Sequence, residues 1–175
     1  VVSENLTQHM REYVLWRVMD HHRQGARYRG QQQKRLWFES AQPIASEISV
    51  GIMGFGSLGR AAADMLLAAG FNVNGWSRRE HSAQGVTTWH GDAGLVPFLN
   101  ATDILVVLLP LTPATRGIID YKLLKQLRRR NPLGGAVLIN AGRGRLQKDE
   151  DILRALDDGT LKEASLDVFE FEPLP

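Results

Sequence analysis

The sequence predicts an α/β protein built on a doubly wound parallel sheet, and three observations lead to this prediction. From residue 48 onward, short apolar runs alternate with segments of helical periodicity. One of these runs, "DILVVLLP", is almost wholly apolar, which is typical of a parallel strand covered on both faces. A glycine-rich turn separates the first apolar run from the first helix. Strands that alternate with helices in this way form parallel sheets with right-handed crossovers.

A segment with a different residue pattern precedes the predicted sheet. Residues 5–23 are expected to form an amphipathic helix, and residues 24–42, which are polar and basic without periodicity, an extended arm. We therefore divide the chain into a leading helix and arm at 1–45 and a globular domain at 46–175. The apolar residues at helical spacing in the leading helix are Leu6, Met10, Tyr13, Val14 and Val18.

The elements of the globular domain follow from its apolar runs and its helix-ending glycines. The expected strands are 48–54, 71–76, 85–89, 103–110, 135–140 and 164–169. The expected helices are 57–70, 120–127 and 148–159.

The composition of the chain excludes several classes of protein and site. The 175 residues are enough for one domain with a real core, and a net charge of +2 is too small to argue for nucleic acid. The chain has no cysteine, which excludes a disulfide framework and a thiolate metal site and suits a reducing cytoplasm. No apolar run reaches the ~20 residues that span a bilayer. We expect a cytoplasmic protein without a membrane segment or a metal site.

The turn after the first strand has the spacing Gly-x-Gly-x-x-Gly, formed by Gly54, Gly56 and Gly59. In a strand–turn–helix context these glycines permit a tight turn, close approach of a pyrophosphate and close packing of the helix. The N–H groups of Ser57 and Leu58 are expected to face the phosphates at the helix N-terminus. The sequence therefore predicts a Rossmann-type dinucleotide site. The alternative is a glycine turn that binds nothing.

The second strand of such folds usually ends at an acid that binds the adenosine ribose. Here the chain has Ser77, Arg78 and Arg79 instead. A serine and two guanidinium groups favour a 2′-phosphate, so the predicted cofactor is NADP (NADPH). The alternative is that both arginines are solvated loop charges. Trp76 is interpreted either as a flank for the adenine or as a core residue.

Several motifs together resemble the D-2-hydroxyacid dehydrogenase family, and within it the NADPH-using glyoxylate/hydroxypyruvate reductases. They are "HMREYVLWRVMDHHRQ", "VGIMGFGSLGR", "GWSRRE", "VVLLPLTPATRGII", "VLINAGRGRLQKDEDILRALDDG" and "LDVFEFEPLP". The resemblance covers nearly the whole chain. It implies an oxidoreductase that transfers a hydride from NADPH to a small 2-keto acid and yields the 2-hydroxy acid.

The resemblance also implies roles for single residues. Arg143 matches the family's catalytic arginine, which holds the substrate carboxylate and polarises the keto oxygen. Glu172 matches the catalytic carboxylate, and Asp167 matches the acid that binds the nicotinamide carboxamide. Two further groups match segments beside the nicotinamide: Leu109, Pro110 and Thr115, and Asn140, Ala141 and Gly142. Each of these polar residues has an alternative reading as a solvated or capping side chain.

The family's acid/base histidine follows the "EPLP" segment, and the chain stops at Pro175. None of its five histidines lies in a matching motif. The chain also begins without Met and lacks most of the family's substrate domain. We therefore expect a piece of a longer protein that binds NADPH but turns over poorly or not at all.

Alternatives remain open for both the partners and the function. The leading helix and arm match the family's dimer contact and carry Trp16, Tyr28, Trp37 and Phe38, so we expect a homodimer. The competing reading of the arm is a basic nucleic-acid-binding segment. The competing function is a dinucleotide-sensing binding protein of the same fold without catalysis. A methyltransferase would share the glycine turn but would need an acid for its ribose.

Overall fold

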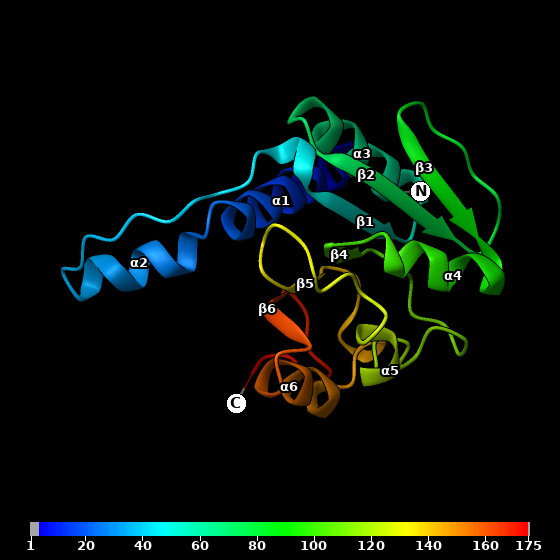
Figure 1. Ribbon diagram of the computed structural model, residues 1–175. Coiled ribbons are helices and arrows are strands. Elements are labelled where there is room, and N and C mark those ends of the chain that lie inside the picture. The colour runs from blue at the N-terminus through cyan, green and yellow to red at the C-terminus, as the bar shows by residue number, and fades with distance from the viewer. Residues whose placement is uncertain (1–3, 175) are drawn as a thin grey trace.

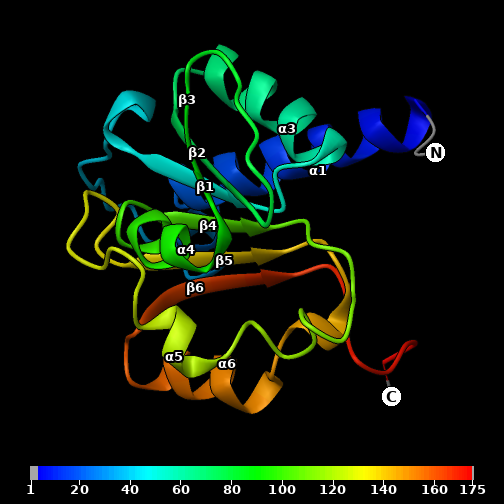
Figure 2. The ribbon, with the colours of Figure 1, turned by 90° about the vertical axis from the view of Figure 1, so that its right-hand side faces the viewer.

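The computed structural model describes residues 4–174; residues 1–3 and 175, at the ends of the two predicted units, lie outside this range. Its centre is a six-stranded, wholly parallel sheet in the order β3-β2-β1-β4-β5-β6 (Figures 1 and 2). The strands are β1 Ser49–Met53, β2 Asn72–Ser77, β3 Val86–His90, β4 Ile104–Val107, β5 Ala136–Asn140 and β6 Leu161–Leu166. The predicted doubly wound Rossmann-type fold is confirmed.

Helices cover both faces of the sheet (Figure 2). Along β4, Ile104 and Val106 join the core under α1 and α3, while Leu105 and Val107 join the core under α4, α5 and α6. This alternation is why the strand reads as a continuous apolar run, because both of its faces are covered. The helices are α1 Glu4–His22, α2 Gly25–Gln33, α3 Ser57–Ala68, α4 Gly91–Asn100, α5 Tyr121–Leu124 and α6 Asp149–Asp157. Short 3-10 turns lie at Ala45–Glu47 and Gly144–Leu146.

The strand order reverses direction between β1 and β4, which are hydrogen-bonded neighbours. The connections from β1 and from β4 leave on opposite faces of the sheet, so the loops after these two strands part at the carboxyl edge. In open α/β sheets, ligands bind in the crevice that this divergence creates. The fold therefore places the glycine turn after β1 beside the loop after β4.

The expectation of an extended arm at 24–42 is wrong for its first half, which forms α2. Gln24 adopts a left-handed conformation at φ 55 and starts the new helix. Arg29 then reaches back to Asp20 with hydrogen bonds of 2.8 and 2.9 Å. Periodicity did not reveal α2 because this helix buries none of its residues. The segment after α2 returns without regular structure (Figure 1).

Other boundaries also differ from the prediction. Helix α4 was not predicted, because its glycines and Pro97 are unfavourable for a helix, yet Phe98 and Leu99 anchor it in the core. Strand β6 begins three residues earlier than the expected 164–169, where Leu161 pairs with Ala136 before a bulge. The expected helix at 120–127 is regular only over α5.

Helix α1 is fastened to the edge strand β6 by buried polar contacts. His21 Nδ1 lies 2.5 Å from Glu163 Oε2, and His21 Nε2 lies 2.8 Å from Ser165 Oγ. The pKa of Glu163 lies below its ordinary value of 4.5, chiefly because its carboxylate accepts the hydrogen bond from His21, while burial opposes this shift. A carboxylate whose pKa is lowered by folding stabilises the fold only while it is ionised.

We expect Glu163→Gln to lower the free energy of unfolding by about 1 kcal/mol at neutral pH. The difference from the parent should shrink as the pH falls below the ordinary glutamate value of 4.5, because the parent's carboxyl then becomes protonated as well. Urea unfolding across this pH range measures it. Glu170→Gln is the control, since Glu170 lies in an exposed ion pair with Arg145 at 3.6 Å. A difference that stays constant with pH would contradict the assignment.

Candidate functional site

A pocket of about 610 Å³ opens at the carboxyl edge of the sheet, at the switch point. Its walls come from the glycine turn, the end of β2, the loop after β4 and the start of α4. It thus joins segments that are far apart in the sequence. The lining residues are Gly54, Phe55, Gly56, Ser57, Leu58, Trp76, Ser77, Arg78, Arg79, His81, Asp92, Leu95, Leu108, Leu109, Pro110, Thr112, Ala114, Thr115 and Ile118.

The glycine turn is tied to its neighbours by backbone contacts. The N–H groups of Gly54 and Phe55 both donate to the carbonyl of Trp76, at 2.9 and 3.1 Å. Gly54 has φ +113, and a Cβ on it would meet the Leu108 backbone at 2.7 Å. The ring of Phe55 is fully buried, against the backbone of Gly75. Gly54 therefore accepts no replacement, because both its backbone conformation and the space around it exclude a side chain.

The other two glycines of the motif differ in what surrounds them. A Cβ on Gly59 would lie 2.4 Å from the Gly54 carbonyl oxygen, whereas a Cβ on Gly56 would have nothing within 4 Å. Gly59 therefore lets α3 pack against the turn, and Gly56 leaves space on the pocket side. No side chain caps the N-terminus of α3. Its first N–H groups, including those of Ser57 and Leu58, have no intrahelical partner and can bind an anion.

The end of β2 contributes the positive charge of the pocket. The Ser77 hydroxyl donates to the Arg79 carbonyl at 2.7 Å, which holds the turn after the strand. Arg78 and Arg79 are exposed, and within residues 4–174 neither has a carboxylate partner. Trp76 is 6% exposed and donates its indole N–H to the Gly91 carbonyl at 2.9 Å. Its ring belongs to the core and contributes only an edge to the pocket.

Three polar residues of the pocket, His81, Asp92 and Thr112, were not identified from the sequence. His81 follows the arginines in the same loop, so proximity to them was the available signal. Asp92 comes from the first turn of α4, a helix that the sequence did not predict. Asp92 reaches the pocket because β3 pairs with β2 in parallel and returns the chain to the same edge.

The loop after β4 is closed by a small hydroxyl network. Thr115 Oγ1 donates to the Pro110 carbonyl at 2.7 Å and accepts from the Thr112 N–H at 2.8 Å. The network fixes the loop that carries Leu109 and Pro110 beside the glycine turn. The predicted residues Leu109, Pro110 and Thr115 therefore lie together in the pocket wall.

The loop after β5 is organised by the fully buried Asn140. Its side chain accepts from the Gly142 N–H at 3.1 Å and donates to the Arg143 carbonyl at 3.3 Å and to Gln147 Oε1 at 2.7 Å. A Cβ on Gly142 would lie 2.9 Å from the Leu109 carbonyl oxygen, so this loop packs directly on the loop after β4. Ala141 is buried and Arg143 is exposed at the carboxyl edge. None of the residues 140–143 lines the 610 Å³ pocket.

The segment after β6 packs on the same loop. The Asp167 N–H donates to the Asn140 carbonyl at 3.0 Å, and a Cβ on Gly144 would overlap the Phe169 carbonyl. Glu172 accepts a hydrogen bond from the Phe169 N–H at 2.8 Å. Asp167, Arg143 and Glu172 thus share the carboxyl edge, outside the pocket. The structure brings the residues predicted to bind the phosphates into one pocket, except Gly59, which does not line it, and leaves the predicted catalytic residues on an open surface beside it.

Residues 4–174 hold neither a metal cluster nor a membrane-spanning helix. No group of three His, Asp or Glu side chains there is placed to hold a metal ion. No helix in that range combines the length and the apolar character that a membrane crossing requires.

Comparison with known proteins identifies the family. Residues 15–175 match the family described as D-isomer specific 2-hydroxyacid dehydrogenase, NAD binding domain. The chain is 42% identical over 166 residues to glyoxylate/hydroxypyruvate reductase A of Salmonella paratyphi B, an alignment that covers 95% of this chain and 52% of that protein. The chain therefore spans about half the length of the curated relatives that it matches.

Two solved structures are similar over almost the whole chain. One is a probable 2-hydroxyacid dehydrogenase from Rhizobium etli in complex with NADP, at 47% identity and a TM-score of 0.97, covering 99% of this chain and 55% of that one. The other is an NADPH-dependent glyoxylate/hydroxypyruvate reductase from Sinorhizobium meliloti in complex with NADP and sulfate, at 49% identity and a TM-score of 0.97, covering 100% and 55%. The chain belongs to the D-isomer specific 2-hydroxyacid dehydrogenase family, and residues 15–175 correspond to its NAD-binding domain.

Proposed function

We propose that the chain binds NADPH and forms the cofactor-binding half of a reductase for small 2-keto acids of the glyoxylate/hydroxypyruvate type. The observation that carries the proposal is the end of β2, where Ser77, Arg78 and Arg79 line the same pocket as the N-terminus of α3. A pyrophosphate at that helix places the adenosine ribose at the end of β2. Two cations without carboxylate partners within the described range fit a phosphate at that position.

The residues of the pocket divide the cofactor between them in this proposal. The turn from Gly54 to Gly59 receives the pyrophosphate, and Ser77, Arg78 and Arg79 receive the 2′-phosphate. Trp76 contributes its edge on the adenosine side. The nicotinamide lies against two segments: Leu109, Pro110 and Thr115 from the loop after β4, and Asn140, Ala141 and Gly142 from the loop after β5. Asp167 accepts hydrogen bonds from the carboxamide.

NADPH supplies the hydride in such a reaction. Arg143, exposed at the carboxyl edge, binds the substrate carboxylate and stabilises the negative charge that develops on the keto oxygen. Glu172 acts with a histidine that protonates this oxygen. We propose that this histidine and the substrate domain belong to the part of the protein outside these 175 residues, since the relatives are about twice as long.

The test is NADPH oxidation by the full-length protein with a panel of 2-keto acids, alongside NADPH binding by the 175-residue chain. The proposal expects turnover of glyoxylate or hydroxypyruvate by the full-length protein and NADPH binding without robust turnover by the chain alone. Binding without any turnover in the full-length protein would favour a dinucleotide-sensing protein instead. Failure to bind either NADPH or NADH would refute the assignment.

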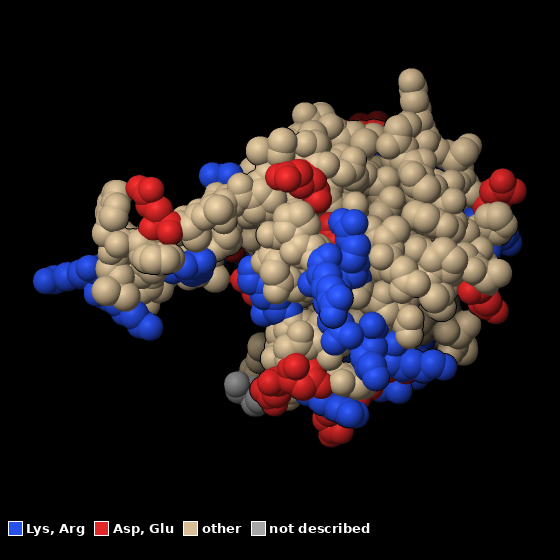
Figure 3. All heavy atoms as spheres, in the orientation of Figure 1, with Lys and Arg blue, Asp and Glu red and all other residues tan. Residues whose placement is uncertain are grey.

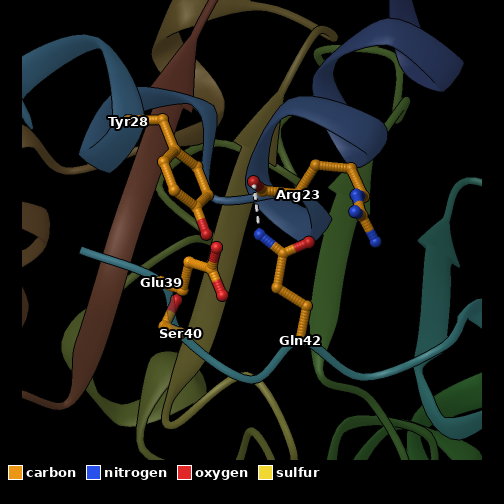
Figure 4. A pocket seen from close by; sticks show the side chains of 5 residues that line it. All are labelled: Arg23, Tyr28, Glu39, Ser40 and Gln42. Carbon is orange, nitrogen blue, oxygen red and sulfur yellow. Dashed lines mark hydrogen bonds between the residues drawn. The ribbon is translucent and has the colours of Figure 1, made fainter. Parts of the chain in front are cut away.

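We also propose that two copies of the chain form a dimer through α1, α2 and the segment after α2. The arm of α2 and the returning segment projects from the body (Figure 1). Its apolar side chains are among the most exposed: Trp37 at 92%, Phe38 at 60% and Leu36 at 58%. A polar hollow of about 520 Å³ lies at the base of the arm. Figure 4 shows the side chains of Tyr28, Glu39 and Gln42 in it, facing one another. Exposed aromatic residues on a projecting arm are typical of interfaces.

We expect the chain to sediment as a dimer at micromolar concentration, because burial of Trp37 and Phe38 against a second copy would remove their apolar surface from water. Analytical ultracentrifugation measures this. Trp37→Glu should shift the equilibrium toward the monomer, whereas Leu153→Glu, at an exposed apolar residue on α6 outside the proposed interface, should leave the dimer intact. A parent protein that sediments as a monomer would contradict the proposal.

The same proposal places the protein in the cytoplasm. A chain of 175 residues without cysteine suits a reducing compartment. Fractionation of cells with an antibody against the protein tests this location.

A further inference from the structure

The pocket at the carboxyl edge contains one acidic side chain to which the proposed function gives no role. Among the residues of 4–174 that line the pocket, Asp92 is the only one with a carboxylate. Within the same range, no ion pair or hydrogen bond occupies this carboxylate. A carboxylate accepts hydrogen bonds and donates none, so the part of a ligand that lies against Asp92 must be a donor.

Asp92 leaves the sheet beside the two arginines of the pocket. The last residue pair between the parallel strands β2 and β3 is Ser77 with His90. Two residues beyond this pair, the chain reaches Arg79 after β2 and Asp92 after β3. Neighbouring strands lie about 4.8 Å apart, so the cations and the acid depart from adjacent points of the same edge. The pocket therefore has positive charge on one wall and an acceptor on the wall beside it.

The first turn of α4, which carries Asp92, is held in place at several points. The buried Trp76 donates its indole N–H to the Gly91 carbonyl at 2.9 Å and so ties this turn to β2. Gly91 has φ +63, a conformation that favours glycine, and it leads the chain from β3 directly into the helix. Phe98 and Leu99 anchor the other end of α4 in the core. The backbone of Asp92 is thus fixed relative to the pocket.

Helix α4 presents an apolar group next to this acid. Leu95 lies three residues after Asp92, on the same face of the helix, and both residues line the pocket. Leu95 and Ile118, a further lining residue, pack against the core beneath. A flat ring with a donor on its edge matches this arrangement, because the ring can contact Leu95 while the donor meets Asp92. Adenine is such a ring, and its C6 amino group is a donor.

We propose that Asp92 binds the adenine of the cofactor: its carboxylate accepts a hydrogen bond from the C6 amino group and so selects adenine over bases that carry oxygen at C6. This inference rests on the proposed function, because it requires the 2′-phosphate beside Arg78 and Arg79. Pocket and ligand are then complementary at both ends, with cations at the phosphate and an acceptor at the amino group. A base with a C6 carbonyl would place one acceptor against another and leave both without a donor.

The experiment compares NADPH with its hypoxanthine analogue, in which a C6 carbonyl replaces the amino group of adenine. Calorimetric titration of the parent protein should show NADPH bound about tenfold more tightly, the effect of one hydrogen bond to a charged group that is exposed to solvent. Asp92→Asn should reduce this preference to about twofold or less, because an amide can accept from an amino group and can also donate to a carbonyl. Removal of a negative charge changes the attraction of the phosphates equally for both ligands, so the ratio of the two affinities isolates the contact with the base.

Glu80→Gln is the matched control for the loss of a negative charge. Glu80 is exposed, follows Arg79 directly and does not line the pocket. This substitution removes the same charge from the neighbourhood of the same arginines. It should leave the preference for adenine at the parent value.

The outcomes separate the inference from the proposed function. A parent protein that binds both nucleotides equally would overturn the inference and leave the proposed function standing. The inference is also wrong if Asp92→Asn keeps the full preference, or if Glu80→Gln reduces it as much as Asp92→Asn does. If the parent binds neither nucleotide, the proposed function fails and the inference fails with it. The parent ratio needs no variant, so it tests the inference even if Asp92→Asn destabilises α4.

Discussion

Replacing Arg78 and Arg79 together with alanine should weaken NADPH binding on the order of 100-fold and leave NADH binding unchanged. A hydrogen bond to a charged group contributes about 1.5–3 kcal/mol, and each 1.4 kcal/mol is tenfold in affinity. Two such bonds, discounted for the exposure of both side chains, give this magnitude. NADH lacks the 2′-phosphate and therefore has no group for the two guanidiniums to bind.

The surroundings of Arg78 and Arg79 allow an effect on binding to be separated from an effect on folding. Both arginines are exposed and lack a carboxylate partner within residues 4–174, so their loss should not destabilise the fold. Arg129→Ala with Arg130→Ala is the matched control, since these are also adjacent exposed arginines. They precede β5 and so lie at the amino edge, opposite the pocket. Figure 3 shows a band of Lys and Arg over the region of β5 and α5, which makes this control a test of general electrostatic attraction.

Calorimetric titration of both cofactors measures the preference directly. An equal loss for NADPH and NADH in the Arg78/Arg79 variant would mean that the arginines act on a part common to both cofactors. A comparable loss in the Arg129/Arg130 variant would mean that net charge, rather than a specific contact, attracts the cofactor. Either result would contradict the assignment of the 2′-phosphate to the end of β2.

The phosphate side of the site was predictable because its residues are contiguous in the sequence and their roles are local. Gly54, Gly56 and Gly59 belong to one turn, and Ser77 is the last residue of β2, the next strand along the chain. A strand buried on both faces and a helix that follows a glycine turn leave little choice of fold. The family match and the sheet order confirm that inference.

The helices that were not predicted are those whose sequences lack a clear apolar periodicity. Helix α2 buries no residue, and its Arg29 is paired with Asp20 of α1. Helix α4 contains Gly94 and Pro97, both unfavourable for a helix, and Phe98 and Leu99 anchor it in the core. Because Asp92 comes from α4, missing the helix also meant missing this part of the pocket wall.

Replacing Gly56 with valine should weaken NADPH binding on the order of 100-fold while the protein keeps its melting temperature. A Cβ at this position has nothing within 4 Å, and the backbone at φ -87 suits any residue. The new side chain would therefore fill only space that the pyrophosphate needs. The loss of two charge-assisted hydrogen bonds to the helix N-terminus accounts for the magnitude.

Gly59→Ala should behave in the opposite way, although it changes the same motif. Its Cβ would lie 2.4 Å from the Gly54 carbonyl oxygen, a backbone atom that cannot move without the turn, so we expect a destabilisation of about 1–3 kcal/mol. Gly30→Val is the control for valine in open space, since a Cβ there also meets nothing within 4 Å and lies on α2, outside the pocket. Thermal melting and NADPH titration of the three variants separate the roles. If Gly56→Val binds NADPH as the parent does, no ligand approaches the turn at Gly56, and the phosphate site must lie elsewhere.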